Sequence, residues 1–205
     1  AGDPDLVYQQ PGVEAGARNW CVITSSDHVV ITGITARHSN RNGIGGWNPG
    51  SHVTVRKCLT EWNWENGIAF EGKVLYQNNT IDNSEGHFNG VGAIGIAGPG
   101  KNAIIRRNIC RSNGKFQSAD GQFDYYHQWT HGIKLFENET NHQEGHEIYE
   151  KLVYGNGRGH PGDRQGRGTG IWIDTVPGHP ENPIIIRHNL IYSNAGNGIF
   201  IEISS

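Results

Sequence analysis

A Gly-Ile dipeptide that recurs along the chain is the feature that most constrains its fold. The dipeptide begins at Gly43, Gly67, Gly95, Gly132, Gly170 and Gly198. A second run also repeats, because Val53-Thr-Val-Arg-Lys-Cys-Leu-Thr aligns without a gap with Ile184-Ile-Ile-Arg-His-Asn-Leu-Ile. Apolar residues alternate in these runs, which is typical of short strands. Strand–turn–strand units of this size cannot bury an apolar face alone, so we expect them to stack.

Stacked short strands without helical periodicity predict an all-β fold. We expect a single right-handed parallel β-helix, a solenoid of about six to seven coils in which each coil rises by one strand spacing. The longer intervals before Gly132 and Gly170 predict long loops there. Residues 1–205 are expected to form one domain, with an irregular lead-in over residues 1–18.

Composition excludes several classes of protein. Six tryptophans and a hydrophobic content of 35% are too many for a disordered chain. A formal net charge of −3 gives no reason to expect a nucleic-acid partner. No apolar stretch approaches the length that a membrane-spanning helix needs, so no membrane span is expected.

The repeats resemble those of a known superfamily. The segments that carry this resemblance are His131-Gly-Ile-Lys-Leu, Gly170-Ile-Trp-Ile-Asp and Gly198-Ile-Phe-Ile-Glu. Over roughly residues 20–205 the chain resembles the right-handed parallel β-helix superfamily, which includes pectate lyases, polygalacturonases and uncharacterised secreted bacterial repeat proteins. The resemblance implies a secreted or cell-surface protein with a polysaccharide partner along one strand face. The polygalacturonase motifs Asn-Thr-Asp and Gly-His-Gly and the pectate lyase arginine signature are missing, so no catalytic residue is carried over.

Two further expectations follow from the resemblance. Asn79, Asn108 and Asn189 resemble the asparagine ladder that such folds place at a tight turn, and we expect this ladder to be partial. An open end of a β-helix exposes unpaired backbone. We therefore expect additional coils, a cap, a partner chain or self-assembly at the ends.

The strand pattern predicts which side chains share one outer face. Side chains alternate along a strand, so residues that follow a buried isoleucine point outward. If Ile68, Ile96, Ile133, Ile171 and Ile199 stack inside, the first outward row contains Ala69, Ala97, Lys134, Trp172 and Phe200. The second outward row contains Glu71, Phe136, Asp174 and Glu202.

Three of these residues are candidate catalytic groups: Lys134, Asp174 and Glu202. Two carboxylates on adjacent coils suit the nucleophile and acid of a retaining glycosidase. The same pair could instead hold Ca²⁺, which prefers carboxylate oxygens, while Lys134 or an arginine acts as the base of an elimination. The candidate substrate-binding residues are Trp172, Phe200, Trp129, Tyr126, His131, Arg164 and Arg167.

The sequence therefore leaves three functions open. The basic and aromatic loop residues favour binding, and cleavage by lyase-type elimination, of an acidic polysaccharide. The alternatives are a glycoside hydrolase that uses Asp174 and Glu202, and a non-catalytic structural or adhesive module of a surface assembly. On a second face of the predicted solenoid, Arg56, Arg106 and Arg187 form an outward stripe that is interpreted as solvated.

Overall fold

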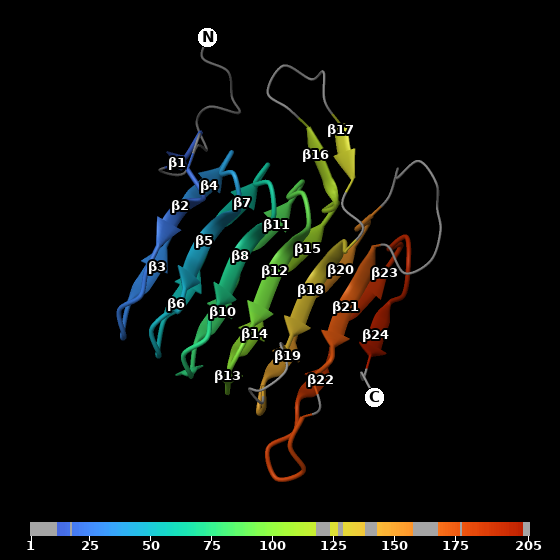
Figure 1. Ribbon diagram of the computed structural model, residues 1–205. Coiled ribbons are helices and arrows are strands. Elements are labelled where there is room, and N and C mark those ends of the chain that lie inside the picture. The colour runs from blue at the N-terminus through green and yellow to red at the C-terminus, as the bar shows by residue number, and fades with distance from the viewer. Residues whose placement is uncertain are drawn as a thin grey trace.

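The structure is a computed structural model, and it describes residues 12–16, 18–117, 124–126, 129–137, 143–157, 168–176 and 178–202. Within these ranges the chain is all-β, and it contains no helix that could cross a membrane. Three large sheets account for most strands, two with seven strands and one with six (Figure 1). Every strand pair in the three sheets is parallel.

The sheets are named A, B and C. Sheet A contains β1 (Gly12–Glu14), β4 (Thr35–Arg37), β7 (Leu59–Glu61), β11 (Glu85–His87), β15 (Ile109–Arg111), β20 (Leu152–Tyr154) and β23 (Leu190–Tyr192). Sheet B contains β2 (Trp20–Ile23), β5 (Asn42–Trp47), β8 (Asn66–Glu71), β12 (Gly92–Ala97), β18 (His131–Phe136), β21 (Thr169–Asp174) and β24 (Ile199–Glu202). Sheet C contains β3 (Val30–Thr32), β6 (Thr54–Arg56), β10 (Thr80–Asp82), β14 (Ile104–Arg106), β19 (Glu147–Tyr149) and β22 (Ile185–Arg187).

Two small sheets complete the described strands. A parallel pair joins β9 (Tyr76–Gln77) to β13 (Gly100–Lys101), and an antiparallel hairpin joins β16 (Lys115–Gln117) to β17 (Asp124–Tyr126). The hairpin belongs to the long insertion that the sequence places before Gly132. Strand β1 pairs with β4 although it lies within the expected lead-in.

The chain visits the large sheets in a fixed order. From β3 to β24 it passes through sheets C, A and B in turn, so that each coil adds one strand to each sheet. Each three-residue strand of sheet C places its central apolar residue inside. Ile31, Val55, Ile81, Ile105 and Ile148 therefore stack in register between the sheets. These parallel sheets are consistent with a parallel β-helix.

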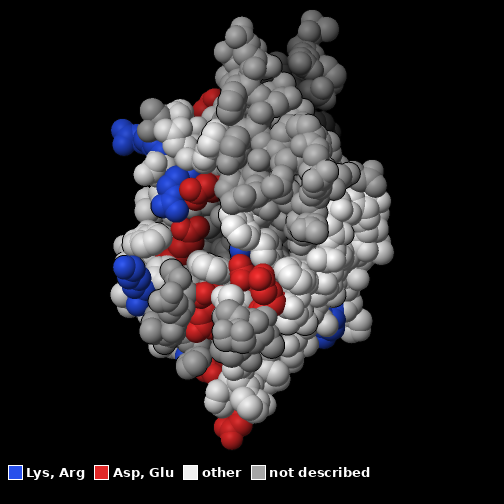
Figure 2. All heavy atoms as spheres, turned by 45° about the vertical axis from the view of Figure 1, so that its right-hand side comes forward, with Lys and Arg blue, Asp and Glu red and all other residues white. Residues whose placement is uncertain are grey.

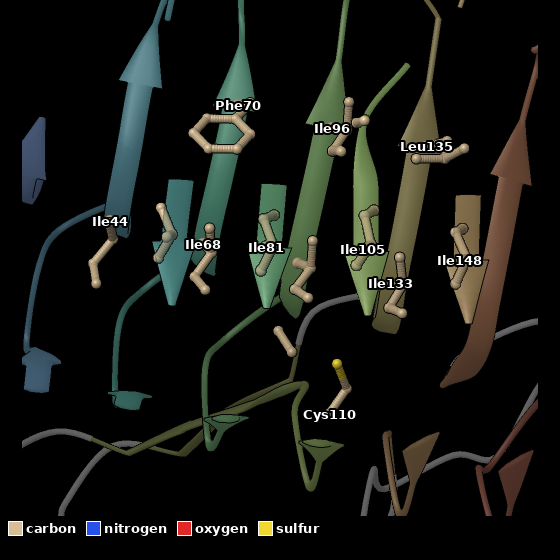
Figure 3. Close-up of a cluster of buried hydrophobic side chains, with 14 of the residues drawn as sticks. Ile44, Ile68, Phe70, Ile81, Ile96, Ile105, Cys110, Ile133, Leu135 and Ile148 are labelled. Atoms are coloured by element: carbon tan, nitrogen blue, oxygen red, sulfur yellow. The ribbon is translucent and has the colours of Figure 1, made fainter. Parts of the chain in front are cut away.

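The register of sheet B corrects one step of the sequence alignment. Ile94, not Ile96, pairs with Ile68 and Ile133, and Ile96 lies between Phe70 and Leu135 (Figure 3). Both isoleucines of β12 point inward because they are two residues apart, so alternation alone could not distinguish them. The Gly-Ile at Gly95 is therefore displaced by two residues from the other repeats.

An uninterrupted asparagine ladder lies at the corner after sheet A. The side-chain amides donate from coil to coil: Asn63 to Asn89 (2.9 Å), Asn89 to Asn113 (3.1 Å), Asn113 to Asn156 (2.9 Å) and Asn156 to Asn194 (2.8 Å). The residue before each of these asparagines turns the chain. At Trp62, Phe88 and Ser112 it has the left-handed φ of +56°, +54° and +53°. This ladder was not predicted from the sequence.

The predicted ladder is partly wrong. Asn108 and Asn189 do share one corner, between sheets C and A, with Cys58, Ser84 and Lys151 on the intervening and preceding coils. Asn79 lies at a different corner, where it precedes β10 and is level with Val53 and Ala103. The coil that contains Asn79 places Ser84, rather than an asparagine, at the corner of Asn108. The ladder is partial, as expected.

Lys151 is the least favourable residue at that corner. The residue is 3% exposed, and its Nζ atom has no hydrogen-bond partner among the described residues. At this corner the backbone N–H of Ser84 donates to Asn108 Oδ1, and that of Lys151 donates to Asn189 Oδ1. A lysine side chain has no carbonyl oxygen, so it cannot accept a hydrogen bond from the backbone N–H of Asn108 on the preceding coil. Burial lowers the pKa of Lys151 well below its usual value of 10.5.

We predict that Lys151→Asn stabilises the protein by about 2 kcal/mol near neutral pH, because it removes a buried unpaired amine and supplies the missing acceptor. The folded chain binds one proton fewer than the unfolded chain between the lowered pKa and 10.5, so wild-type stability rises with pH in this window. The advantage of Lys151→Asn should therefore shrink as the pH approaches 10.5. Urea unfolding across this range measures it. Lys151→Met, which removes the amine without adding an acceptor, should gain less, and a destabilising Lys151→Asn at every pH would contradict the prediction.

Candidate functional site

A groove with a cavity volume of ≈ 620 Å³ runs across the outer face of sheet B. It crosses β8, β12, β18, β21 and β24. Trp64, Glu65 and Glu71 line the part at β8, and Asp174 and Glu202 line the part at β21 and β24. Small residues in β12, among them Gly95 and Ala97, leave the space between these two parts open. The groove thus lies where the sequence placed the outward rows.

In β18, β21 and β24 the two outward rows contain the predicted residues. Lys134, Trp172 and Phe200 are Cα partners across β18, β21 and β24. Phe136, Asp174 and Glu202 form the next row. In β12 the two-residue displacement makes Gly95, rather than Ala97, the partner of Lys134, while Ala97 joins the row of Phe136.

Lys134 lies at the centre of this cluster. Its Nζ atom is 2.6 Å from Asp174 Oδ2 and 3.8 Å from the centroid of the Trp172 ring. The rings of Phe136 and Trp129 lie at 5.0 and 5.4 Å from the same atom. Burial lowers the pKa of Lys134, and the Asp174 carboxylate opposes that shift. The ammonium group is therefore held by one carboxylate and three aromatic rings.

The two candidate carboxylates come from adjacent strands. Asp174 is 7% exposed, and Glu202 is half-buried and accepts a hydrogen bond of 3.3 Å from Trp172 Nε1. Their Cα atoms are partners in β21 and β24, about 4.8 Å apart by the spacing of neighbouring strands. The described residues contain no group of three or more His, Cys, Asp or Glu side chains that could hold a metal ion. Lys134 occupies the position beside Asp174 where a calcium ligand set would have to form.

The aromatic residues of the cluster differ in their exposure. Trp172 is only 4% exposed, because it packs between Trp129 (5.8 Å between centroids) and Phe200 (5.7 Å) and beneath Lys134. Trp129 is 47% exposed and presents the open aromatic surface of the groove. His131 is 3% exposed, and its Nδ1–H donates to the Trp129 carbonyl at 2.8 Å. His131 thus fixes the backbone that carries Trp129.

Acidic groups at the β8 part were not all predicted. The sequence rows contain Glu71 but not Glu65, which lies directly before β8 and lines the groove. Arg41 bridges the two acids, with Nε 3.0 Å from Glu65 Oε2 and Nη2 3.4 Å from Glu71 Oε2. Burial and the neighbouring Glu65 raise the pKa of Glu71, while Arg41 opposes them.

Carboxylates dominate the charge of the groove. Four acids line it, Glu65, Glu71, Asp174 and Glu202, and Lys134 is the single cation among the described lining residues. Figure 2 shows acidic surface gathered beside a hollow near the middle of the view. The predicted binding residues Arg164 and Arg167 lie outside the described residues. Tyr126 ends β17, but its side chain also lies outside the described part.

Comparison of the chain with known protein families, with curated proteins and with solved structures finds no match.

Proposed function

We propose that the three parallel sheets wind into one right-handed parallel β-helix and that sheet B carries a glycan-binding groove on its outer face. The fixed order in which the chain visits sheets C, A and B supports a single winding. Parallel crossover connections are right-handed in about 98% of cases. The open groove and the exposed Trp129 ring suit an extended chain of sugars, and such a protein would act in the secreted or cell-surface setting that the resemblance implies.

The groove favours hydrolysis as its reaction. The observation that carries this proposal is the pair Asp174 and Glu202, whose Cα atoms are partners on adjacent strands about 4.8 Å apart. This backbone spacing lets the two carboxyl groups approach to the separation of about 5–5.5 Å that retaining glycosidases use. Asp174, paired with Lys134, is the nucleophile. Glu202 protonates the leaving oxygen and later activates water.

The charge of the groove favours a neutral or amine-bearing glycan. Its described lining carries four acids and one lysine, and that lysine is already paired with Asp174. Arg41 pairs with Glu65 and Glu71, so four acids face two cations and the field stays acidic. A polyuronate would bring further carboxylates into this field and be repelled. The expectation of an acidic glycan drew on basic and aromatic loop residues, of which Arg164 and Arg167 lie outside the described residues.

Elimination is the second candidate reaction, and one observation favours it. Burial lowers the pKa of Lys134, which would leave more of its amine unprotonated and able to accept a proton near neutral pH. The 2.6 Å ion pair with Asp174 favours the protonated form instead. A uronate substrate would therefore have to displace Asp174 from Lys134 before proton transfer.

A panel of neutral, amine-bearing and uronate polysaccharides tests the proposal. Hydrolysis yields new reducing ends without ultraviolet absorbance, and elimination yields an unsaturated, absorbing product. We expect reducing ends from a neutral or amine-bearing glycan. Unsaturated product from a uronate would establish elimination and contradict hydrolysis. Retardation in affinity electrophoresis without any product would favour a non-catalytic binding, structural or adhesive module.

A further inference from the structure

A second cleft lies away from the groove, at the corner where sheet C leads into sheet A. It has a cavity volume of ≈ 320 Å³ and is lined by Arg56, Lys57, Asp82, Asn83 and Arg107. Three successive coils supply these residues. Arg56, Asp82 and Arg106 are Cα partners in β6, β10 and β14. The residues that follow them, Lys57, Asn83 and Arg107, turn the corner with left-handed φ values of 52°, 46° and 54°.

The single acid of this cleft is fully engaged by one coil. Arg107 binds Asp82 through two contacts, Nε to Oδ1 at 2.8 Å and Nη2 to Oδ2 at 2.5 Å. Arg106 Nη2 adds a third contact to Oδ2 at 3.2 Å. These arginines lower the pKa of Asp82. Asp82 therefore pairs with both arginines of that coil, and both of its oxygens accept hydrogen bonds.

The coil on the other side of Asp82 keeps its charge. Arg56 and Lys57 are exposed, and neither has an ion-pair partner in the described part of the chain. The cleft is thus lined by three cations and one acid. Stacked coils hold these cations near one another whether or not an anion is present, so an anion that enters the cleft relieves their mutual repulsion.

We propose that this corner binds a tetrahedral oxyanion, a phosphate or sulfate group. Arg56 and Lys57 would contact it from one coil and Arg107 from two coils further on, about 10 Å away along the stack, a span that long side chains can bridge. Arg56 can pair with such an oxyanion through parallel N–H donors, and Asp82 does not engage Arg107 Nη1. Asn83 lines the cleft on the intervening coil. A compact anion with two charges matches the excess of two cations, whereas a carboxylate carries one. This site does not depend on the proposed chemistry of the groove.

Calorimetric titration of the whole chain with inorganic phosphate, inorganic sulfate and acetate tests the site. Phosphate and sulfate should bind and acetate should bind at least about tenfold more weakly. The double variant Arg56→Gln/Lys57→Gln should weaken phosphate binding by at least about tenfold. Asp82→Asn should strengthen it, because Arg106 and Arg107 lose their competing carboxylate. Arg187→Gln is the matched control, since Arg187 shares the row but pairs with Glu147 and does not line the cleft.

Two results would overturn the proposal: no phosphate or sulfate binding by the wild-type chain, or phosphate binding that the double variant retains in full. Thermal melting confirms that each variant is folded. Arg56 and Lys57 are exposed, so we expect their replacement to change the melting temperature little. Glucose 6-phosphate and glucose 6-sulfate identify the source of the anion. Tighter binding of a sugar ester than of the free ion supports a group carried by a glycan, and equal binding supports the free ion.

Discussion

Asn113→Ala should lower the free energy of unfolding by about 3–5 kcal/mol, because it removes the central member of the asparagine ladder. Asn113 is 2% exposed. Its Oδ1 accepts from the backbone N–H and the side-chain amide of Asn89, and its Nδ2 donates to Gly86 O and Asn156 Oδ1. Alanine leaves these groups without partners inside the protein, where water cannot replace them. Urea unfolding monitored by circular dichroism measures the loss.

The end of the same ladder provides the control. Asn194 accepts from Asn156 and donates to Val153 O, but it is only half-buried on the last described coil. Asn194→Ala should therefore cost clearly less than Asn113→Ala, because water can reach the groups that it leaves. Equal costs, or a cost below about 1 kcal/mol for Asn113→Ala, would show that the ladder does not determine stability.

The strand rows could be predicted because the sequence itself contains their period. Isoleucine at every coil fixes which side faces inward, and alternation then places Lys134 with Trp172 and Asp174 with Glu202. The same logic failed at Ile94 and Ile96, which are both inward positions of one strand. Alternation shows which face of the sheet a residue is on, but it does not distinguish two registers that differ by two residues.

The corners were harder to predict because their residues do not alternate. Asn89, Asn113 and Asn156 follow left-handed residues as different as Phe88, Ser112 and Gly155, and turns of variable length separate the ladder members. The sequence of β21 alone did not predict that Trp172 is buried, because Trp172 is at an outward position of the strand. It depends on Trp129, which a long insertion brings over the strand face. Contacts made by insertions require the three-dimensional structure.

Asp174→Asn should lower kcat for glycan hydrolysis by at least about 10³-fold, if Asp174 is the nucleophile of the groove. An amide is a poor nucleophile, and it also leaves the buried Lys134 ammonium without its carboxylate. Reducing-end assays on the glycan identified in the panel measure the loss. Glu65→Gln is the matched control in the same groove. Its ion pair with Arg41 is partly exposed, so it should change kcat by less than about tenfold.

Loss of activity in Asp174→Asn could also arise from misfolding, since removing one partner of a buried ion pair is costly. The double variant Lys134→Met/Asp174→Asn removes both charges and should restore the melting temperature without restoring hydrolysis. Lys134→Met alone then separates the two candidate reactions. Under hydrolysis the two carboxylates remain and part of the activity survives, whereas under elimination the base is gone and activity is abolished. Full activity in Asp174→Asn would exclude Asp174 as the nucleophile whatever its effect on stability.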